Sequence, residues 1–200
     1  MSELYVESPL AHRETTQGLS IELREITGRG MIDLRGLASD RKFLAAAKKV
    51  LGLDLPKAPR TSNSWGDVKA LWLSVDQWLI LCARLKVGEL VSSLREELGP
   101  THSLVVDVSD MRAALRLEGE GVREVLLKGS SLDLLSNDYK PGTVRRVRFA
   151  EIAALLHVVE GSVFDIYVFR SYADYCWEFL LATARAPARV KLFGNQATSA

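Results

Sequence analysis

The sequence predicts an α+β fold made of two pseudo-symmetric β-α-β-β-α units, each with an antiparallel or mixed sheet covered by helices. Three observations support this prediction. Residues 32–36 alternate between apolar and polar side chains as a strand does, and residues 41–51 carry apolar side chains at helical spacing. The same order returns over 114–119 and 122–128, which indicates an internal duplication. Each copy then continues with two strands and a second apolar helical stripe.

The first copy has clear signals at the ends of its elements. Ser39-Asp40 is a good N-cap sequence for the first helix, and Gly52 is a typical residue at a helix end. Residues 70–73 and 78–82 form two strands joined by a turn. The second helix stops at Gly99-Pro100, and its apolar face carries Val87, Leu90, Val91, Leu94 and Leu98.

The second copy repeats this arrangement with a shorter first helix. Residues 114–119 form its first strand, residues 122–126 mark the helix, and Gly129 closes it. Residues 152–159 and 164–169 form two strands joined by a turn. Ser171 caps the last helix, whose apolar stripe consists of Tyr172, Tyr175, Cys176, Phe179 and Leu180.

The expected domain organisation is two units with a tail at each end. The first unit should span 17–100 and the second 101–192, with flexible tails over 1–16 and 193–200. Segment 57–67 lacks periodicity and is expected to be loose. Additional strands are expected over 20–26, 103–108 and 144–149.

The composition is that of a globular protein of 200 residues, with 48% hydrophobic and 26% charged residues. A net charge of +1 gives no electrostatic reason to expect nucleic acid or a membrane as the partner. The most apolar run, 71–83, is too short to span a bilayer and contains Asp76. Residues 1–5 lack the features of a signal peptide, so we expect a cytoplasmic location.

The residues that could carry catalysis are scattered. Cys82 and Cys176 lie far apart among apolar neighbours, where buried and unreactive thiols are expected. His12, His102 and His157 are each isolated from other metal ligands, and His157 fits a core or edge position of a strand. The sequence has no nucleophile elbow and no phosphate-binding loop. These absences argue against a catalytic or metal site in this chain.

Two glycine pairs contain the start of a dinucleotide-binding loop but lack its third glycine and its surrounding βαβ unit. These pairs are Gly28-Arg29-Gly30 and Gly119-Glu120-Gly121. For the second pair we expect a tight turn from strand to helix, with Glu120 near the positive end of the helix dipole.

Two groups of residues are candidates for a contact with another protein. Arg145 and Arg148 belong to the densest basic cluster, for which a solvated strand face is the simpler interpretation. Arg170, Tyr172 and Tyr175 open the last helix, and Arg and Tyr are frequent at interface hot spots. Core packing of the two tyrosines is an equal alternative.

Several ordered motifs resemble the sarcosine oxidase gamma subunit family. The resemblance runs from about residue 20 to residue 181, and the order of the motifs makes it more specific than any one of them. The motifs are Met31 to Gly36, Gly52-Leu53-Asp54-Leu55-Pro56, Leu71 to Leu79, Val106 to Leu117, Leu127 to Leu134, Pro141-Gly142, and Arg170 to Tyr175 with Trp177.

This resemblance implies a role in a heterotetrameric sarcosine oxidase. Such complexes oxidatively demethylate sarcosine to glycine and pass the one-carbon unit to tetrahydrofolate. The implied partners are the alpha, beta and delta subunits, which would hold FAD, FMN, NAD, zinc and tetrahydrofolate, while this chain would bind no cofactor and would be a structural subunit. The implied fold is similar to the aminomethyltransferase T-protein of the glycine cleavage system.

One possible folate contact follows from the same resemblance. In T-proteins an Asp shortly after the first helix of such a unit contacts folate, and Asp133 matches that position here. Asp54 occupies the same place in the first copy, which favours a turn-stabilising role for both. Three other hypotheses remain: a stand-alone folate-binding one-carbon transferase, a subunit of a related N-methyl amino acid dehydrogenase, and an RNA-interaction module.

Overall fold

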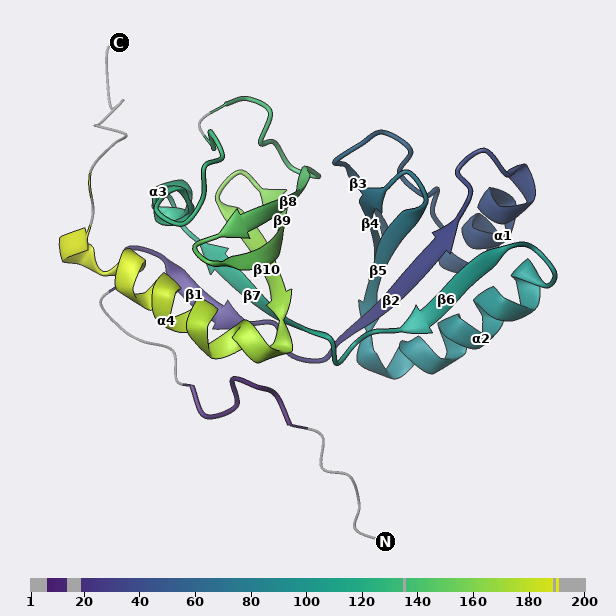
Figure 1. The fold of residues 1–200 in the computed structure, drawn as a ribbon, viewed down its shortest axis with the longest axis horizontal. Coiled ribbons are helices and arrows are strands. Elements are labelled where there is room, and N and C mark those ends of the chain that lie inside the picture. Colours follow the sequence, from purple (N-terminus) through teal and green to yellow (C-terminus); the bar gives the residue numbers. More distant parts are fainter. Residues whose placement is uncertain (1–6, 14–18, 135, 189, 191–200) are drawn as a thin grey trace, which may run out of the picture. The chain divides into compact units, whose positions relative to one another are not determined.

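The computed structural model describes residues 7–13, 19–134, 136–188 and 190. The chain divides into two compact units (Figure 1). We call one the β2 unit, which consists of Ile26–Arg112 with Gly142–Arg146, and the other the β7 unit, which consists of Met1–Glu25, Ala113–Pro141 and Val147–Ala200. Each unit contains one sheet and two α-helices, so the predicted α+β class is confirmed.

The sheet of the β2 unit has the strand order β3-β4-β5-β2-β6. All of its neighbouring strands pair antiparallel. The strands are β2 (Arg29–Gly36), β3 (Ser62–Trp65), β4 (Val68–Ser74), β5 (Gln77–Ala83) and β6 (Ser103–Asp107). The helices are α1 (Arg41–Leu51) and α2 (Val87–Leu98), the latter preceded by the 3-10 turn η1 (Arg84–Lys86).

Helix α1 begins and ends where its sequence indicates. The Asp40 carboxylate accepts hydrogen bonds from the backbone N–H groups of Lys42 at 2.8 Å and Phe43 at 3.3 Å. Gly52 ends the helix with a φ of 72°, and its N–H donates to the Lys48 carbonyl. The buried face of α1 packs Phe43 against Trp78 of β5, with 5.7 Å between the ring centroids. The predicted cap and core stripe of this helix are therefore confirmed.

The sheet of the β7 unit has the strand order β1-β7-β10-β9-β8. Its strands are β1 (Glu22–Glu25), β7 (Arg112–Glu118), β8 (Val144–Phe149), β9 (Ile152–Glu160) and β10 (Val163–Phe169). Its helices are α3 (Val122–Leu127) and α4 (Ala173–Ala184), with the 3-10 turns η2 (Arg170–Tyr172) and η3 (Ala186–Ala188) beside α4. The strands predicted over 20–26, 103–108 and 144–149 correspond to β1, β6 and β8.

The two sheets have matching strand orders, but the division of the chain differs from the predicted boundaries of 17–100 and 101–192. Strand β1 pairs with β7, with Leu23 opposite Leu117. Strand β6 pairs with β2, with Val105 opposite Leu34. Strand β1, predicted in the first unit, thus joins the sheet of the β7 unit, and strand β6, predicted in the second unit, joins the sheet of the β2 unit. In each case the apolar residues of the edge strand complete the core of the sheet that it joins. Sequence spacing could not show this exchange.

Segment 57–67 contains strand β3 and is therefore not the loose loop that the sequence predicted. Ser62 pairs with Leu71 and Trp65 with Val68. The Asn63 side-chain amide donates to the Asp54 carbonyl at 2.7 Å. Because the strand lies at the edge of the sheet and carries polar side chains, it has no apolar alternation to reveal it.

Part of the predicted N-terminal tail is ordered against the β7 unit. Leu10 is buried in its core, and Arg13 donates to Asp174 of α4 at 2.9 Å. The Arg170 guanidinium donates to the Glu7 carbonyl. The rest of the predicted tails, 1–6, 14–16 and 193–200, lies outside the described residues.

Each unit has its own apolar core between its sheet and its helices. The core of the β2 unit includes Trp78, and Cys82 is buried in it. The core of the β7 unit includes Trp177, and Cys176 is buried in it. His157 on β9 is also buried, as expected of a histidine within an apolar run. In the part of the chain that the structure describes, no helix is long and apolar enough to cross a membrane.

The pair Gly119 and Gly121 forms the predicted strand-to-helix turn. Gly119 has a φ of 123°, which side chains disfavour, and its carbonyl accepts from the Val122 N–H at 3.2 Å. The Gly121 carbonyl accepts from the Val125 N–H inside α3. This turn geometry explains why glycines occur at these two positions, and a nucleotide-binding role is not needed to explain them.

Gly129, which follows α3, permits a test of core packing in the β7 unit. A Cβ at Gly129 would lie 2.5 Å from Phe149 Cε2 and 2.8 Å from Phe179 Cε1, and these rings pack edge to face at 5.3 Å. We expect Gly129→Ala to lower the free energy of unfolding by about 1–3 kcal/mol through overpacking. Gly161→Ala is the control, since a Cβ there meets nothing within 4 Å. Urea unfolding of both variants checks this, and equal stabilities would contradict the packing argument.

Candidate functional site

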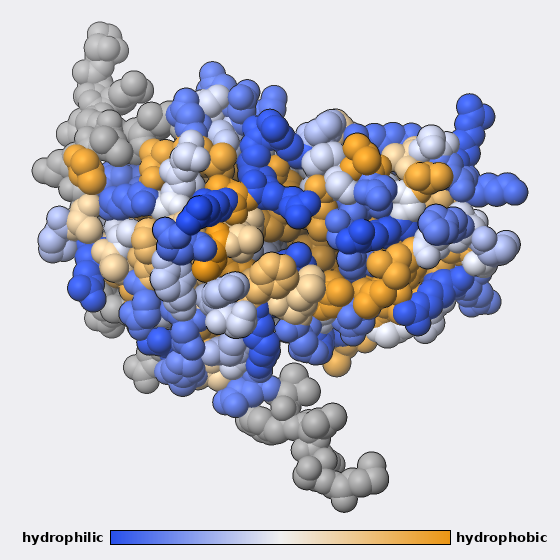
Figure 2. Space-filling view, viewed as in Figure 1, coloured by the Kyte–Doolittle hydropathy of each residue, from blue (hydrophilic) through white to orange (hydrophobic). Residues whose placement is uncertain are grey.

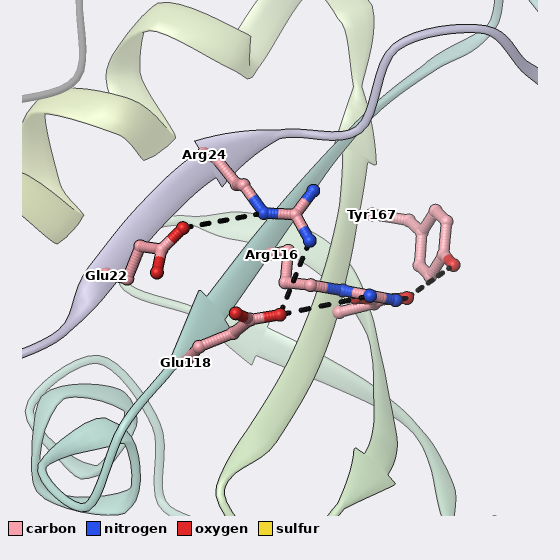
Figure 3. A network of polar contacts seen from close by, with 6 residues as sticks. Glu22, Arg24, Arg116, Glu118 and Tyr167 are labelled. Carbon is pink, nitrogen blue, oxygen red and sulfur yellow. Dashed lines mark hydrogen bonds and ion pairs between the residues drawn. The ribbon is translucent and has the colours of Figure 1, made fainter.

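A chain of charged side chains crosses the β7-unit sheet on the face opposite its helices (Figure 3). It starts at Glu22 and Arg24 on the edge strand β1, continues through Glu118 and Arg116 on β7, and ends at Asp165 on β10. We call these five residues the sheet-face network. The charges of Asp165 and Arg116 are carried by neighbouring strands of one sheet, so backbone pairing fixes their positions.

The strongest link in the sheet-face network joins Arg116 to Asp165. Arg116 Nε donates to Asp165 Oδ1 at 2.6 Å and Nη2 donates to Oδ2 at 2.9 Å, which is a bidentate pair. Asp165 is 1% exposed and Arg116 19% exposed. The Tyr167 hydroxyl also donates to Asp165 Oδ2, at 3.4 Å. The hydrogen bond to Asp165 is the main reason that the pKa of Arg116 is raised.

The outer links of the network follow from the register of β1 on β7. Glu22 lies directly opposite Glu118, and Arg24 lies directly opposite Arg116, so like charges face each other across the strands. The side chains avoid this by pairing diagonally, with Arg24 Nη2 at 3.3 Å from Glu118 Oε1. Arg116 Nη1 lies 3.9 Å from the same oxygen. Glu118 therefore separates the two arginines and lowers their repulsion.

Sequence reasoning missed the sheet-face network, although a weak signal was present. Glu22 and Arg24 alternate with apolar residues, as do Arg116 and Glu118, and Asp165 interrupts an otherwise apolar strand. These charges could be recognised as solvated positions of amphipathic strands. That Asp165 is buried and paired with Arg116 depends on the adjacency of β7 and β10, which are separated by α3, β8 and β9 in the chain.

The predicted folate position, Asp133, lies in the exposed segment after α3. Its carbonyl accepts from the Ser136 N–H at 3.1 Å. The segment is held from inside by Arg123 of α3, whose guanidinium donates to the carbonyls of Leu134 and Tyr139. Arg123 also lies 5.4 Å from the centre of the Phe164 ring. Asp133 thus lies in a loop that Arg123 holds in place. No local sequence pattern indicated this role of Arg123.

The corresponding residue of the other unit, Asp54, forms an exposed ion pair. Lys48 Nζ donates to Asp54 Oδ2 at 2.9 Å, and the two side chains are 59% and 71% exposed. The sequence favoured a turn-stabilising role for both Asp54 and Asp133. An exposed pair such as Lys48–Asp54 contributes at most about 1 kcal/mol.

Three of the five predicted interface residues lie together at the start of α4. Tyr172 and Tyr175 are 46% and 42% exposed, beside Arg170 and the exposed Phe169. We call Phe169, Arg170, Tyr172 and Tyr175 the aromatic surface. The ring of Tyr175 is stacked on Phe179 at 6.5 Å, so it is held in place although it is exposed. The structure thus leaves the tyrosines available at the surface, where sequence reasoning gave equal weight to core packing.

The remaining two predicted interface residues lie on β8. Arg148 is exposed and forms an ion pair with Glu151, which is also exposed. Arg145 is half-buried. The two side chains point to opposite faces of the strand because they are an odd number of residues apart. They therefore do not form one basic surface.

Among the described residues, no group of three or more His, Cys, Asp or Glu side chains could hold a metal ion. Burial raises the pKa of Cys176 to about 12 and also raises the pKa of Cys82, so both thiols stay protonated at neutral pH. Burial lowers the pKa of Arg112, and the charge of Asp33 partly offsets this effect.

Several residues of the motifs that resemble the family form hydrogen bonds between strands and loops. Ser109 Oγ accepts from the Met31 N–H at 2.9 Å and donates to Asp107 at 2.5 Å, which holds the end of β6 against β2. The Trp78 indole N–H donates to the Pro56 carbonyl at 2.8 Å. Gln77 donates twice to the Asp33 carboxylate, at 2.9 and 3.0 Å. These residues fix strand pairing and loop positions.

The Arg116–Asp165 pair generates a stability prediction. Arg116→Met leaves the Asp165 carboxylate buried without its main partner, and we expect a loss of about 3 kcal/mol in the free energy of unfolding. The double variant Arg116→Met/Asp165→Leu should recover most of that loss, because it removes the buried charge as well. Arg24→Met is the control at an exposed pair and should cost less than about 1 kcal/mol. Chemical denaturation of the three variants measures these differences, and an unaffected Arg116→Met would refute the assignment.

Comparisons with known proteins point to one family. A model of the family "Sarcosine oxidase, gamma subunit" matches residues 35–186. The sarcosine oxidase subunit gamma of Corynebacterium sp. (strain U-96) is 29% identical over 159 residues, which cover 74% of this chain and 75% of the relative.

Solved structures show that the fold is shared as well. A chain of the heterotetrameric sarcosine oxidase from Corynebacterium sp. U-96, in complex with pyrrole 2-carboxylate, matches with a TM-score of 0.83 at 23% identity, covering 94% of this chain and 98% of that one. The glycine cleavage system aminomethyltransferase T from Bartonella henselae matches with a TM-score of 0.61 at 16% identity. That match covers 82% of this chain and 46% of the aminomethyltransferase, so the predicted aminomethyltransferase-like fold is confirmed.

The family match is broad enough to decide membership. Residues 35–186 include strands and helices of both units, from the end of β2 to the end of α4. The chain belongs to the sarcosine oxidase gamma subunit family.

Proposed function

We propose that this chain is the gamma subunit of a heterotetrameric sarcosine oxidase and acts there as a structural, non-catalytic subunit. The observation that carries the proposal is the family match over residues 35–186. The relative from Corynebacterium supports it, since the matching solved chain belongs to a heterotetrameric sarcosine oxidase and is covered over 98% of its length.

The proposed complex converts sarcosine to glycine and transfers the released one-carbon unit to tetrahydrofolate. In this proposal FAD, FMN, NAD, zinc and tetrahydrofolate are bound by the alpha, beta and delta subunits, and the complex is cytoplasmic. Turnover of sarcosine by the purified complex, compared with other N-methyl amino acids, separates a sarcosine oxidase from a related dehydrogenase.

The chemistry of the polar residues supports a structural role. In the sheet-face network both oxygens of Asp165 accept hydrogen bonds from Arg116, so this carboxylate is engaged in a contact between two strands. Arginine does not act as an acid or base at neutral pH. The thiols of Cys82 and Cys176 are buried and protonated. These groups stabilise the chain, and no pair among them is arranged for proton transfer or nucleophilic attack.

The aromatic surface is our proposed contact with a larger subunit. Tyrosine and arginine are enriched at interface hot spots. A tyrosine ring buries much area at a low cost in side-chain entropy. Tyr175 is already ordered by its stacking on Phe179, which lowers that cost further. Arg145 and Arg148, whose side chains lie on opposite faces of β8, are proposed as separate polar contacts with a partner subunit and not as part of the aromatic surface.

Assembly tests the proposed function directly. We expect this chain to co-purify with its cognate alpha, beta and delta subunits, and Tyr172→Ser/Tyr175→Ser to weaken this association by about tenfold or more. Trp65→Ser is the control, because Trp65 is an exposed aromatic residue of the β2 unit. The isolated chain should show no flavin absorbance. Failure of the wild-type chain to co-purify with any cognate subunit would overturn the subunit assignment, and an unchanged double variant would overturn only the aromatic surface.

The folate-binding alternative has its own test at Asp133. We expect calorimetric titration of tetrahydrofolate into the isolated chain to show no saturable binding, with Asp133→Ala and Asp54→Ala behaving alike. The structural match to an aminomethyltransferase covers only 46% of that enzyme, so a complete T-protein site would need elements beyond this chain. Saturable binding that Asp133→Ala abolishes and Asp54→Ala preserves would show instead that this chain is a folate-binding subunit.

A further inference from the structure

An apolar patch is exposed at one end of the β2-unit sheet. It consists of Leu37, Val75, Leu104 and Val106, which are 58%, 74%, 43% and 36% exposed. Leu37 follows β2, Val75 lies in the turn between β4 and β5, and the other two lie on β6. We call these four residues the β6 patch. In Figure 2 hydrophobic side chains reach the surface in the region where Figure 1 draws β6.

Backbone pairing places the members of the β6 patch next to one another. The Gly36 N–H donates to the Asp76 carbonyl at 3.1 Å, which brings Leu37 beside the turn that carries Val75. Leu104 lies opposite Arg35 on β2, and Val106 lies opposite Asp33. Residues directly opposite each other share one face of a sheet, so Leu104 and Val106 lie on the face opposite α1 and α2.

The equivalent strand of the other unit shows that this exposure is not required by the fold. Strand β1 occupies the same edge position in the order β1-β7-β10-β9-β8 that β6 occupies in β6-β2-β5-β4-β3. On the face opposite the helices β1 carries Glu22 and Arg24, which belong to the sheet-face network. Charged residues on an exposed edge prevent unwanted association. The β6 patch has apolar residues where this protection would be expected.

The backbone edge of β6 is partly covered, so the side chains are the available contact. Arg95 of α2 donates to the Val105 carbonyl through Nε at 3.2 Å and Nη2 at 2.7 Å. A partner that added a strand to this edge would have to displace the guanidinium. Docking on the Leu104 and Val106 side chains leaves Arg95 undisturbed.

Arg35 is the half-exposed cation beside the β6 patch, and Asp76 is an exposed carboxylate in the turn that carries Val75. Asp33 lies 3.6 Å from Arg35, and its oxygens also accept from Gln77. Arg112 interacts electrostatically with the same carboxylate. One carboxylate thus faces two guanidinium groups, of which Arg35 is 48% exposed at the rim of the patch. A carboxylate on the partner would complement this positive charge.

We propose that the β6 patch is a second docking surface, which receives an apolar surface of another subunit of the oxidase complex that carries a carboxylate opposite Arg35. This inference rests on the proposed function and adds a contact site in the β2 unit to the aromatic surface of the β7 unit. Burial of Leu37, Val75, Leu104 and Val106 supplies apolar contact, and the carboxylate opposite Arg35 fixes the orientation.

Thiol labelling of the assembled complex tests this proposal. Cys82 and Cys176 are buried, and burial raises the pKa of both thiols, so native cysteines give little background. A cysteine introduced by Val106→Cys should be protected from a maleimide in the intact complex and react after denaturation. Leu85→Cys is the control. Leu85 is 98% exposed and follows the end of β5 where Ala83 pairs with Arg29, whereas the patch lies at the opposite end, where Gln77 pairs with Arg35. It should be labelled in both states.

Association measurements test the energetic role and the stated chemistry. We expect Leu104→Thr/Val106→Thr, which keeps two residues suited to a strand, to weaken co-purification about tenfold or more, while Leu85→Thr has no effect. Arg35→Gln should weaken the complex and reduce its sensitivity to salt. If the wild-type complex forms but Val106→Cys is labelled as fast as Leu85→Cys and the threonine variant assembles normally, the β6 patch is not an interface and the proposed function stands. If the wild-type chain does not assemble at all, the proposed function itself fails.

Discussion

The pairing of an edge strand to each sheet is the constraint on which the rest of this structure depends. Strand β6 pairs with β2, so the β2-unit sheet is made of five consecutive strands, whereas β1 pairs with β7 across the whole β2 unit, so the β7-unit sheet contains one strand from a distant part of the chain. The Ser109 hydroxyl holds the end of β6 by bonding the Met31 N–H. Leu23 of β1 and Val105 of β6 each enter the core of the sheet they join.

Strands β1 and β6 occupy equivalent edge positions in their sheets, but one presents charged side chains and the other apolar side chains. On the face opposite the helices β1 presents Glu22 and Arg24, which are engaged by neighbouring charges. On the corresponding face of β6 are Leu104 and Val106, which remain exposed. Antiparallel pairing satisfies the backbone hydrogen bonds on the paired side of both strands, so this pairing does not restrict their side chains to one chemical type. The difference therefore lies in the side chains of the two edge strands and not in their backbone pairing.

The buried charges of this protein are arranged for stability. The bidentate contact of Arg116 with Asp165 satisfies a carboxylate that is almost fully buried, and Tyr167 adds a third hydrogen bond. Arg123 likewise holds the segment after α3 by donating to the Leu134 and Tyr139 carbonyls. In both cases a guanidinium donates the hydrogen bonds that acceptor oxygens of buried residues require.

The sequence by itself determined the α+β class, the caps of α1, the buried cysteines and the family. Those features depend on local periodicity, capping residues and ordered motifs, all of which are visible in a linear chain. The tertiary structure alone decided the exchange of β1 and β6, the existence of β3, and the union of Arg116 with Asp165. It also showed that Tyr172, Tyr175, Leu104 and Val106 stay exposed. The physical reason is that sheet neighbours and solvent exposure are set by contacts between residues far apart in the sequence, which no local pattern records.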